Sequence, residues 1–222
     1  MRTVTPSCAA AEVSDSVLEP EPPRAAEVFG DRIELARRFT ASLARHGEER
    51  GLIGPLEVPR LWTRHILNSA VAAPFFEGRS ADIGSGAGLP GLVLAIARPD
   101  VQWTLIEPME RRTAWLSEQV DDLGLDNVTV ARMRGEEWTE GRVFDTVTAR
   151  AVSALRTLLP FTAPLVRPGG RLVLLKGANV DAEITKAAKQ MRAFGLEDVR
   201  VEVVGEGIVA EPTRVFVATV TR

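Results

Sequence analysis

The chain has 222 residues, 45% of them hydrophobic and 26% charged, which is typical of one globular domain large enough to bury a full core. No apolar run is long enough to span a membrane and no secretory signal is visible, so we expect a cytoplasmic protein that does not act at a membrane. One cysteine and two histidines exclude a disulfide framework and a cysteine-rich metal centre, and we expect no metal.

The formal net charge of −3 comes from the start of the chain. Residues 1–23 hold one basic and four acidic residues, so the remaining chain is neutral overall. This segment is also rich in proline, serine and alanine, which predicts a disordered acidic tail. The net charge therefore gives no indication of a nucleic-acid partner. Any such partner would have to bind a local basic surface.

Residues 24–78 are predicted to form a helical extension. Apolar residues recur at helical spacing between Ala25 and His46, which indicates an amphipathic helix. A loop with three glycines and two prolines follows over residues 47–59. A second helix is expected over residues 60–73, ended by Pro74.

From residue 79 to residue 222 the pattern changes to strand, loop and helix. The expected strands are residues 80–83, 102–106, 128–131, 144–149 and 171–175, and the expected helices are 91–98, 110–123, 153–165 and 181–194. Residues 167–170 read as a turn that feeds the fifth strand. Two last strands, 199–204 and 214–220, have no helix between them and can pair antiparallel. This predicts an α/β fold with a mainly parallel seven-stranded sheet, an antiparallel C-terminal strand and helices on both faces, as in the Rossmann-like methyltransferases.

The most informative segment is the glycine-rich loop that follows the first strand. Gly86, Gly88 and Gly91 match the spacing of the dinucleotide fingerprint, which would suit a nicotinamide cofactor. The strand ends at residue 83, however, so the turn begins at Gly84, and read from there the third glycine position holds Leu89. The sheet also uses the whole chain and leaves no second domain for a hydride acceptor.

S-adenosylmethionine fits this loop better. Asp82 and Glu107 close two adjacent strands, where one carboxylate can anchor the turn or meet a cationic cofactor and the other can accept from ribose hydroxyls. The run after the third strand, with Gly135 and Glu136, is expected to lie over the adenine ring. We therefore expect S-adenosylmethionine in a site that includes the loop residues Asp82, Gly84, Ser85, Gly86, Gly88 and Leu89, together with Glu107, Gly135 and Glu136.

Several motifs in order along the chain resemble the RsmG family, once called glucose-inhibited division protein B. These motifs are Arg64-His65-Ile66-Leu67-Asn68-Ser69, the run from Asp82 to Gly91 that ends Leu-Pro-Gly, Arg134-Gly135-Glu136-Glu137, Arg150-Ala151 and Leu175-Lys176-Gly177. The resemblance covers the chain from about residue 25 to its end. It implies methylation of N7 of a guanine in 16S ribosomal RNA, at nucleotide 527 in the family, with Gly84, Leu89, Gly135, Glu136 and Arg150 contacting the cofactor.

The sequence lacks the residues that other kinds of RNA methylation need, which agrees with methylation of guanine N7. Methylation of pyrimidine carbon normally needs a cysteine nucleophile, and Cys8 lies in the predicted tail. Guanine N7 already has a lone pair in the plane of the ring, so in-line methyl transfer needs no general base and no covalent intermediate. We expect no catalytic acid or base, and Arg150 is the candidate for orienting the cofactor or the guanine.

RNA contacts are expected where loops meet the cofactor site, and the candidates are Arg60, Arg64, His65, Arg111, Arg112 and Lys176. Because the globular part is neutral, a small-subunit particle or its precursor is the expected substrate, with no obligate protein partner. Two other readings stay open at this point. One is a methyltransferase for a small molecule or protein, and the other is a regulator that binds the cofactor without catalysis.

Overall fold

The computed structural model describes residues 17–222, so most of the predicted acidic tail lies outside the described residues. The described chain contains one seven-stranded sheet in the order β3-β2-β1-β4-β5-β7-β6. Its strands are β1 (Arg79–Ile83), β2 (Gln102–Ile106), β3 (Val128–Ala131), β4 (Phe144–Thr148), β5 (Val166–Lys176), β6 (Leu196–Val204) and β7 (Thr213–Val220). β1 to β5 are parallel, and β7 runs antiparallel to both β5 and β6. The predicted fold is therefore confirmed.

The register aligns the ends of the central strands. Asp82 in β1 lies opposite Leu105 of β2 on one side and Thr148 of β4 on the other. The residues that follow these three strands consequently emerge side by side at one edge of the sheet, where ligands of open α/β sheets bind.

One predicted turn is wrong. Residues 167–170 lie inside β5, which already pairs at Val166 with Phe144 of β4 before the register shifts and pairing resumes at Arg171 with Thr146. The Pro-Gly-Gly sequence signals irregular backbone here, but it makes a bulge in a continuous strand instead of ending it.

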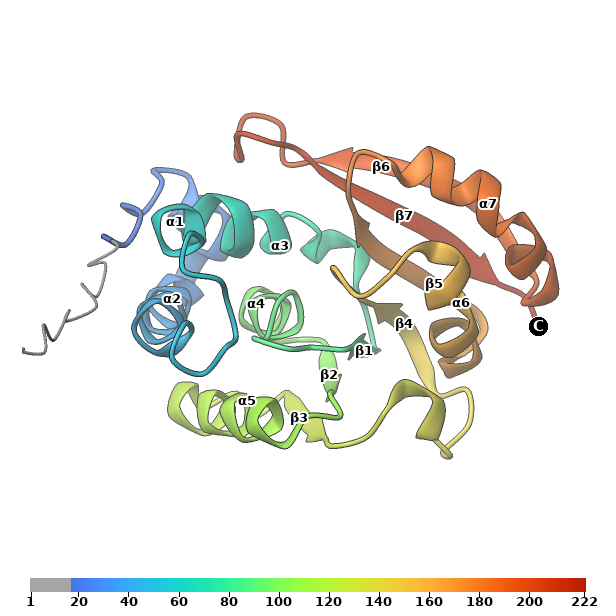
Figure 1. The fold of residues 1–222 in the computed structure, drawn as a ribbon, viewed down its shortest axis with the longest axis horizontal. Helices are drawn as coiled ribbons and strands as arrows, with labels where there is room; N and C mark the ends of the chain where they lie inside the picture. The colour runs from blue at the N-terminus through green and yellow to red at the C-terminus, as the bar shows by residue number, and fades with distance from the viewer. Residues whose placement is uncertain (1–16) are drawn as a thin grey trace, which may run out of the picture.

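The helices lie on both faces of the sheet (Figure 1). The α-helices are α1 (Ala25–Phe29), α2 (Ile33–His46), α3 (Asn68–Ala70), α4 (Gly91–Ala97), α5 (Glu110–Leu123), α6 (Leu155–Thr162) and α7 (Val180–Ala193). Short helical turns are η1 (Gly30–Arg32), η2 (Val58–Arg60), the π-helical turn η3 (Trp62–Leu67), η4 (Ala73–Phe75), η5 (Gly135–Glu137) and η6 (Ala163–Leu165). α1 to α5 pack on one face and α6 and α7 on the other, each face with its own buried apolar cluster.

The first part of the helical extension is more broken than the sequence predicts. The expected helix over residues 25–46 is interrupted at Gly30, whose φ of +52° leaves the helical region and separates α1 from η1 and α2. The expected helix over residues 60–73 is confirmed as continuous right-handed helical backbone, which runs from η2 through η3 and α3 to η4 and changes only in its type of hydrogen bonding. Pro59 and Pro74, which lack an amide N–H, lie in η2 and η4.

The predicted disorder does not hold for residues 17–23. The backbone N–H of Glu19 donates to the Val58 carbonyl, and its carboxylate accepts from the backbone N–H (3.0 Å) and hydroxyl (2.8 Å) of Thr63. Glu21 accepts two hydrogen bonds from the guanidinium of Arg37, at 2.6 and 2.8 Å. The composition of this segment hides these contacts because each depends on one acidic side chain finding a distant partner.

Candidate active site

The glycine-rich loop forms a cradle between β1 and α4. The backbone N–H groups of Gly84 and Ser85 both donate to the carbonyl of Ile106, at 2.8 and 3.3 Å, which ties the loop to the end of β2. Gly88 has a φ of +94°, and a Cβ there would lie only 2.5 Å from the Leu92 side chain. Gly86 has a φ of +56° with no atom closer than 3.7 Å to its would-be Cβ, so its neighbourhood is open.

Asp82 lies fully buried beneath this cradle. One of its carboxylate oxygens accepts from the backbone N–H of Gly91 at 3.0 Å, and the other has no hydrogen-bond partner. Burial raises the pKa of Asp82 to about 7, although the Gly91 N–H and the positive charge of Arg150 favour the ionised form. A buried oxygen without a partner marks a group that can respond to a cationic neighbour.

Glu107, at the end of β2, is also buried, with only 2% of its side chain exposed. Its two carboxylate oxygens accept from the backbone N–H groups of Gly86 and Met109, each at 3.0 Å. The guanidinium of Arg112 lies 3.9 Å away. Both oxygens are fixed at the cradle, and each retains a lone pair for a further donor such as a hydroxyl group.

Arg150 follows β4 at the centre of the same edge and forms a bridge with Leu175 of β5. Its guanidinium donates to Nδ1 of His65 at 2.7 Å, to the hydroxyl of Ser69 at 3.2 Å and to the backbone carbonyl of His65 at 3.5 Å. Burial lowers the pKa of Arg150 to about 10, opposed by the charge of Asp82, so the guanidinium is still charged at neutral pH. The next residue, Ala151, has a φ of +55°, which turns the chain sharply away from the strand.

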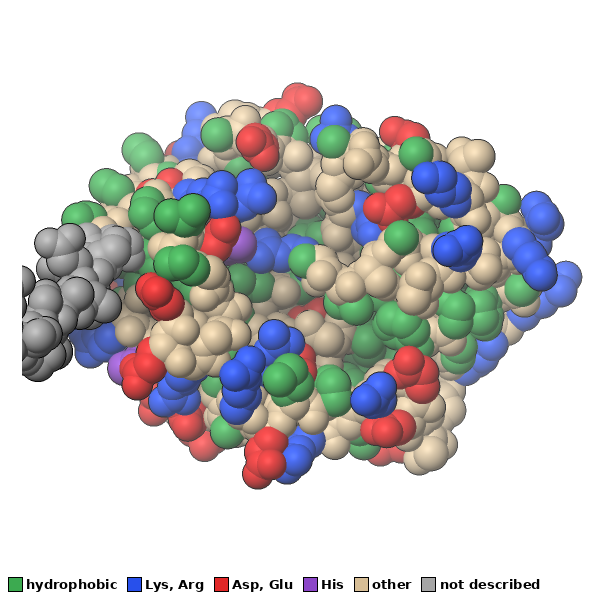
Figure 2. All heavy atoms as spheres, in the orientation of Figure 1, with side chains coloured by type: hydrophobic (Ala, Val, Ile, Leu, Met, Phe, Trp, Pro, Cys, Tyr) green, Lys and Arg blue, Asp and Glu red, His purple; other side chains and the backbone are tan. Residues whose placement is uncertain are grey.

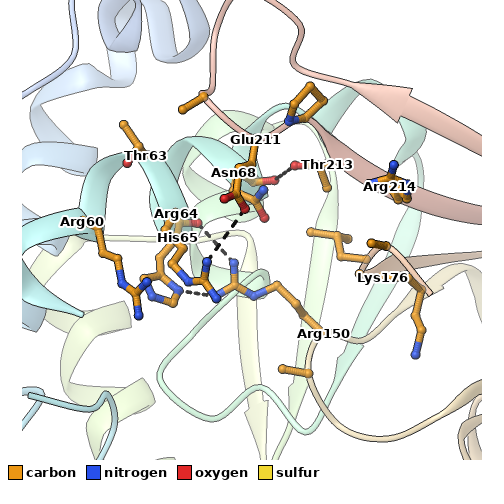
Figure 3. Close-up of a pocket in the computed structure, with 16 residues that line it drawn as sticks. Arg60, Thr63, Arg64, His65, Asn68, Arg150, Lys176, Glu211, Thr213 and Arg214 are labelled. Carbon is orange, nitrogen blue, oxygen red and sulfur yellow. Dashed lines mark hydrogen bonds and ion pairs between the residues drawn. The ribbon is translucent and has the colours of Figure 1, made fainter. Parts of the chain in front are cut away.

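A pocket of about 770 Å³ opens beside Arg150 (Figure 3). Its walls come from η2 and η3, from the ends of β4 and β5, and from the start of β7 with the loop before it. The side chains and backbone that line it belong to Arg60, Thr63, Arg64, His65, Asn68, Arg150, Ala151, Leu175, Lys176, Gly177, Ala178, Ala210, Glu211, Pro212, Thr213 and Arg214. On the molecular surface, basic side chains gather along the margin of a central hollow (Figure 2). We call this the basic pocket.

The structure sorts the predicted RNA-binding residues into three groups. Arg60 and Arg64 line the basic pocket, and both also pair with Glu57. Arg111 lies outside the pocket lining, with its guanidinium beside Gly51, and Arg112 lies beside Glu107. Arg112 therefore borders the cradle, and Arg111 borders the loop of the helical extension at Gly51.

Lys176 and His65 line the basic pocket but are engaged by the protein itself. The ammonium of Lys176 lies 2.8 Å from the Glu183 carboxylate and donates to the Ser153 carbonyl at 2.9 Å, and only 9% of the side chain is exposed. His65 bridges Arg150 and Glu57 and has 15% of its side chain exposed. Neither side chain presents a free polar group to RNA in this structure.

The predicted adenine-side residues lie after β3. Gly135 is buried, and a Cβ there would lie 3.2 Å from both Ile83 and the carbonyl of Phe161. Glu136 is exposed. Leu89 is buried at the far end of the cradle.

Sequence reasoning missed the pocket residues that come from the end of the chain. Thr213 donates to the backbone carbonyl of Asn68 at 2.9 Å, which links the start of β7 to the helical extension 145 residues earlier. Glu211 and Arg214 enter the pocket with it. No local motif surrounds these residues, so only the pairing of β7 between β5 and β6 reveals them.

Residues 17–222 contain no group of three or more histidine, cysteine, aspartate or glutamate side chains placed to hold a metal ion. Within the same described range, no helix combines the length and apolar character needed to cross a bilayer. The site therefore consists of two acidic strand ends, a glycine cradle and a basic pocket that meet at Arg150.

Comparison with known proteins identifies the family of the chain. The family model described as "rRNA small subunit methyltransferase G" (GidB) matches residues 32–212. The ribosomal RNA small subunit methyltransferase G of Leifsonia xyli subsp. xyli is 61% identical over 209 residues, which cover 94% of this chain and all of that protein.

Solved structures agree in fold at low sequence identity. The S-adenosylmethionine-dependent methyltransferase SibL has a TM-score of 0.58 and 18% identity, covering 88% of this chain and 74% of that one. The tRNA (m1A58) methyltransferase TrmI from Aquifex aeolicus has a TM-score of 0.55 and 12% identity, covering 70% and 68%. The fold is that of the class I S-adenosylmethionine-dependent methyltransferases, and the chain belongs to the GidB family, rRNA small subunit methyltransferase G.

Proposed function

We propose that this protein transfers a methyl group from S-adenosylmethionine to N7 of one guanine in 16S ribosomal RNA, at nucleotide 527 in the family's numbering. The observation that carries the proposal is the position of Arg150. This one side chain acts electrostatically on the buried Asp82 below the cradle and also lines the basic pocket. A cofactor site and a site for a polyanion therefore share a boundary.

The residues at the cradle fit the cofactor. The region around Gly86 is open to a ligand, and the two buried carboxylates suit a ligand that carries positive charge and ribose hydroxyls. Glu107 would accept from the ribose, Gly135 and Glu136 would border the adenine, and the loop residues from Gly84 to Leu89 would line the remainder. The cofactor supplies a methyl group bound to a positively charged sulfur.

The chemistry asks little of side chains beyond alignment. Guanine N7 attacks through an existing lone pair, so no proton has to be removed first. Holding two reactants in line can reach effective molarities on the order of 10⁵–10⁸ M. A guanidinium bonded to N7 would block the attack, so the arginines of the basic pocket serve as donors to guanine O6 and to phosphates instead.

The proposed partner is 16S RNA inside a small-subunit particle or its precursor, which would be met in the cytoplasm. The four arginines of the basic pocket are a local positive surface on a chain whose net charge is −3. Such a patch supports docking on a structured RNA surface better than tight binding to any RNA strand. No obligate protein partner is part of the proposal.

Mass-spectrometric mapping of methylated guanines in 16S RNA, with and without the gene, tests this function. We expect one N7-methylguanine to disappear from the deletion strain and to return with the wild-type gene. Gly84→Val should not restore it, because the added side chain would meet Val152 at 3.1 Å and strain a backbone with a φ of +71°.

Two results would overturn the proposal. Unchanged 16S RNA in the deletion strain would favour a small-molecule or protein acceptor. Full restoration by Gly84→Val would favour a role without catalysis.

A further inference from the structure

Arg150 is held by acceptors that carry no charge. Its three hydrogen-bond partners are the imidazole of His65, the hydroxyl of Ser69 and a backbone carbonyl. A carboxylate in any of these places would neutralise the guanidinium. Neutral acceptors fix its direction and leave its full positive charge for a ligand at the boundary of cradle and pocket.

These contacts dictate the protonation of His65. A guanidinium can only donate, so Nδ1 of His65 must accept and the proton must lie on Nε2. Nε2 lies 2.6 Å from a carboxylate oxygen of Glu57, which selects this tautomer. The other oxygen of Glu57 accepts from Arg60 at 2.5 Å, and Nε of Arg64 lies 3.6 Å from the oxygen that faces His65.

Burial and the charge of Arg150 favour the neutral imidazole of His65. Burial lowers the pKa of His65, and the charge of Arg150 lowers it further against the opposing effect of Glu57. Although burial opposes ionisation of Glu57, its hydrogen bonds from His65 and Arg60 lower its pKa, so it stays charged. A neutral acceptor is thus kept between an anion and a cation.

The extension supplies all of these groups. His65 and Ser69 are one helical turn apart, on the same side of the η3–α3 segment, and the Ser69 hydroxyl donates to the His65 carbonyl at 2.6 Å. Figure 3 shows Arg150 reaching from the end of β4 toward His65 on this segment. The extension therefore reaches the centre of the site.

We propose that His65, oriented by Glu57, is a positioning residue that fixes the guanidinium of Arg150 between the cofactor cradle and the basic pocket. The inference rests on the proposed function for its kinetic consequence. Its geometric content, one tautomer held between Glu57 and Arg150, stands apart from the identity of the acceptor.

Two substitutions test the roles of the two ring nitrogens of His65 separately. The side-chain oxygen of asparagine reaches the position of Nδ1, so His65→Asn keeps an acceptor for Arg150. The side-chain nitrogen of glutamine reaches the position of Nε2, so His65→Gln keeps the donor to Glu57 and loses the acceptor. A structural role for His65 would be disturbed by both, whereas a positioning role is damaged chiefly by His65→Gln.

The kinetic test uses 16S RNA lacking the modification, as small-subunit particles. We expect His65→Gln to lower kcat/KM for methylation by about 10- to 100-fold, the range for a hydrogen bond to a charged group. His65→Asn should stay within about threefold of wild type, since the same kind of bond to Arg150 is kept. The only other histidine, His46 at the end of α2, supplies the control His46→Gln with unchanged kinetics.

A double-mutant cycle with Arg150→Met shows whether His65 acts through Arg150. In that background His65→Gln should lower kcat/KM by less than about twofold, because the group it positions is already gone. Equal losses for His65→Asn and His65→Gln, or losses that multiply with Arg150→Met, would overturn the proposal.

The imidazole ¹⁵N chemical shifts give a readout that needs no substrate. We expect His65 as the neutral Nε2–H tautomer, with an Nδ1 resonance that moves in Arg150→Met while that of His46 stays in place. A protonated Nδ1 would overturn the inference even in an active enzyme. The expected shifts in a protein that methylates no guanine would instead reject the proposed function and leave the positioning contact intact.

Discussion

Asp82 is a carboxyl group whose burial sets a measurable pH dependence. Its pKa is raised to about 7, so between pH 4 and 7 the folded state holds a proton that the unfolded chain has released. The free energy of unfolding must therefore fall as pH rises through this window. At about 1.4 kcal/mol for each unit of pKa shift, the decline approaches 4 kcal/mol.

Asp82→Asn provides the comparison, because asparagine can still accept from Gly91 and does not ionise. Urea denaturation of both proteins at several pH values should show the two stability curves diverging between pH 4 and 7, with wild type losing more. Parallel curves would mean that Asp82 titrates at an ordinary pKa.

The cradle offers a matched pair of glycine substitutions. Gly86 and Gly124 have φ values of +56° and +62°, and neither has an atom within 3.6 Å of its would-be Cβ. Alanine at either position should lower the free energy of unfolding by a similar amount, about 1–2 kcal/mol. Gly86→Ala should in addition weaken S-adenosylmethionine binding about tenfold or more by calorimetry, since its Cβ would occupy the cradle. Equal cofactor affinity in both variants would place the cofactor elsewhere.

For single residues, the sequence predicts the acidic side chains at the strand ends but does not predict the contacts between residues far apart in the chain. Asp82 and Glu107 can be found because a strand followed by a charged residue is a local pattern. Arg150 and His65 are 85 positions apart, and their bond depends on how the extension folds back over the sheet. Nothing near Glu57 signals that it orients a histidine.

Among the elements, the loop between β4 and α6 depends on two side chains of the neighbouring segment. The ammonium of Lys176 holds the Ser153 carbonyl, and the carboxylate of Glu183 accepts from the Leu155 N–H at 2.9 Å while pairing with Lys176. The end of this loop that leads into α6 is thereby fixed. The sequence predicts an RNA contact for Lys176 because it is expected after the fifth strand, on the cofactor side of the sheet, whereas in the structure it is the last residue of β5.

Lys176→Met tests which role holds. We expect a loss of roughly 2 kcal/mol in stability from the broken pair, and faster amide hydrogen exchange over residues 150–155. Lys186→Met on exposed α7 is the control and should change neither. Unchanged exchange together with weaker binding to small-subunit particles would restore the RNA contact.

Regular elements were predictable where the local pattern was uninterrupted. The strand over residues 102–106 and the helix over residues 110–123 have the predicted bounds, since apolar periodicity and Gly124 define them locally. The extension was not predictable in detail, because its short turns are fixed by packing on α4 and by Pro59 and Pro74.

For the whole molecule, residues 17–23 belong to the folded body. Glu19 accepts two hydrogen bonds from Thr63 in η3, and Glu21 forms a paired contact with Arg37 in α2. A protein that begins at residue 17 is the reference for a deletion that also removes residues 17–23. Removing residues 1–23 should lower the free energy of unfolding by roughly 1–3 kcal/mol, discounted for partial exposure of these pairs.

Thermal unfolding of the two truncated proteins checks this expectation. A full-length variant with Glu19→Gln and Glu21→Gln should show part of the stability loss that the longer deletion causes, because it lacks the same carboxylates. If the two truncated proteins unfold at the same temperature, the contacts of Glu19 and Glu21 carry no net stability.

The strand order also has a consequence for how the protein folds while it is being synthesised. β7 lies between β5 and β6 although it follows both in the sequence, so β6 has no strand to pair with until β7 has been synthesised. Residues that line the basic pocket, Thr213 and Arg214 among them, arrive with that final strand. A nascent chain that has been synthesised only as far as residue 212 therefore has β5 as an unpaired sheet edge and an incomplete pocket. The basic pocket, which we propose to bind ribosomal RNA, is therefore complete only after β7 has left the ribosome, so it cannot receive RNA while its own walls are still being made.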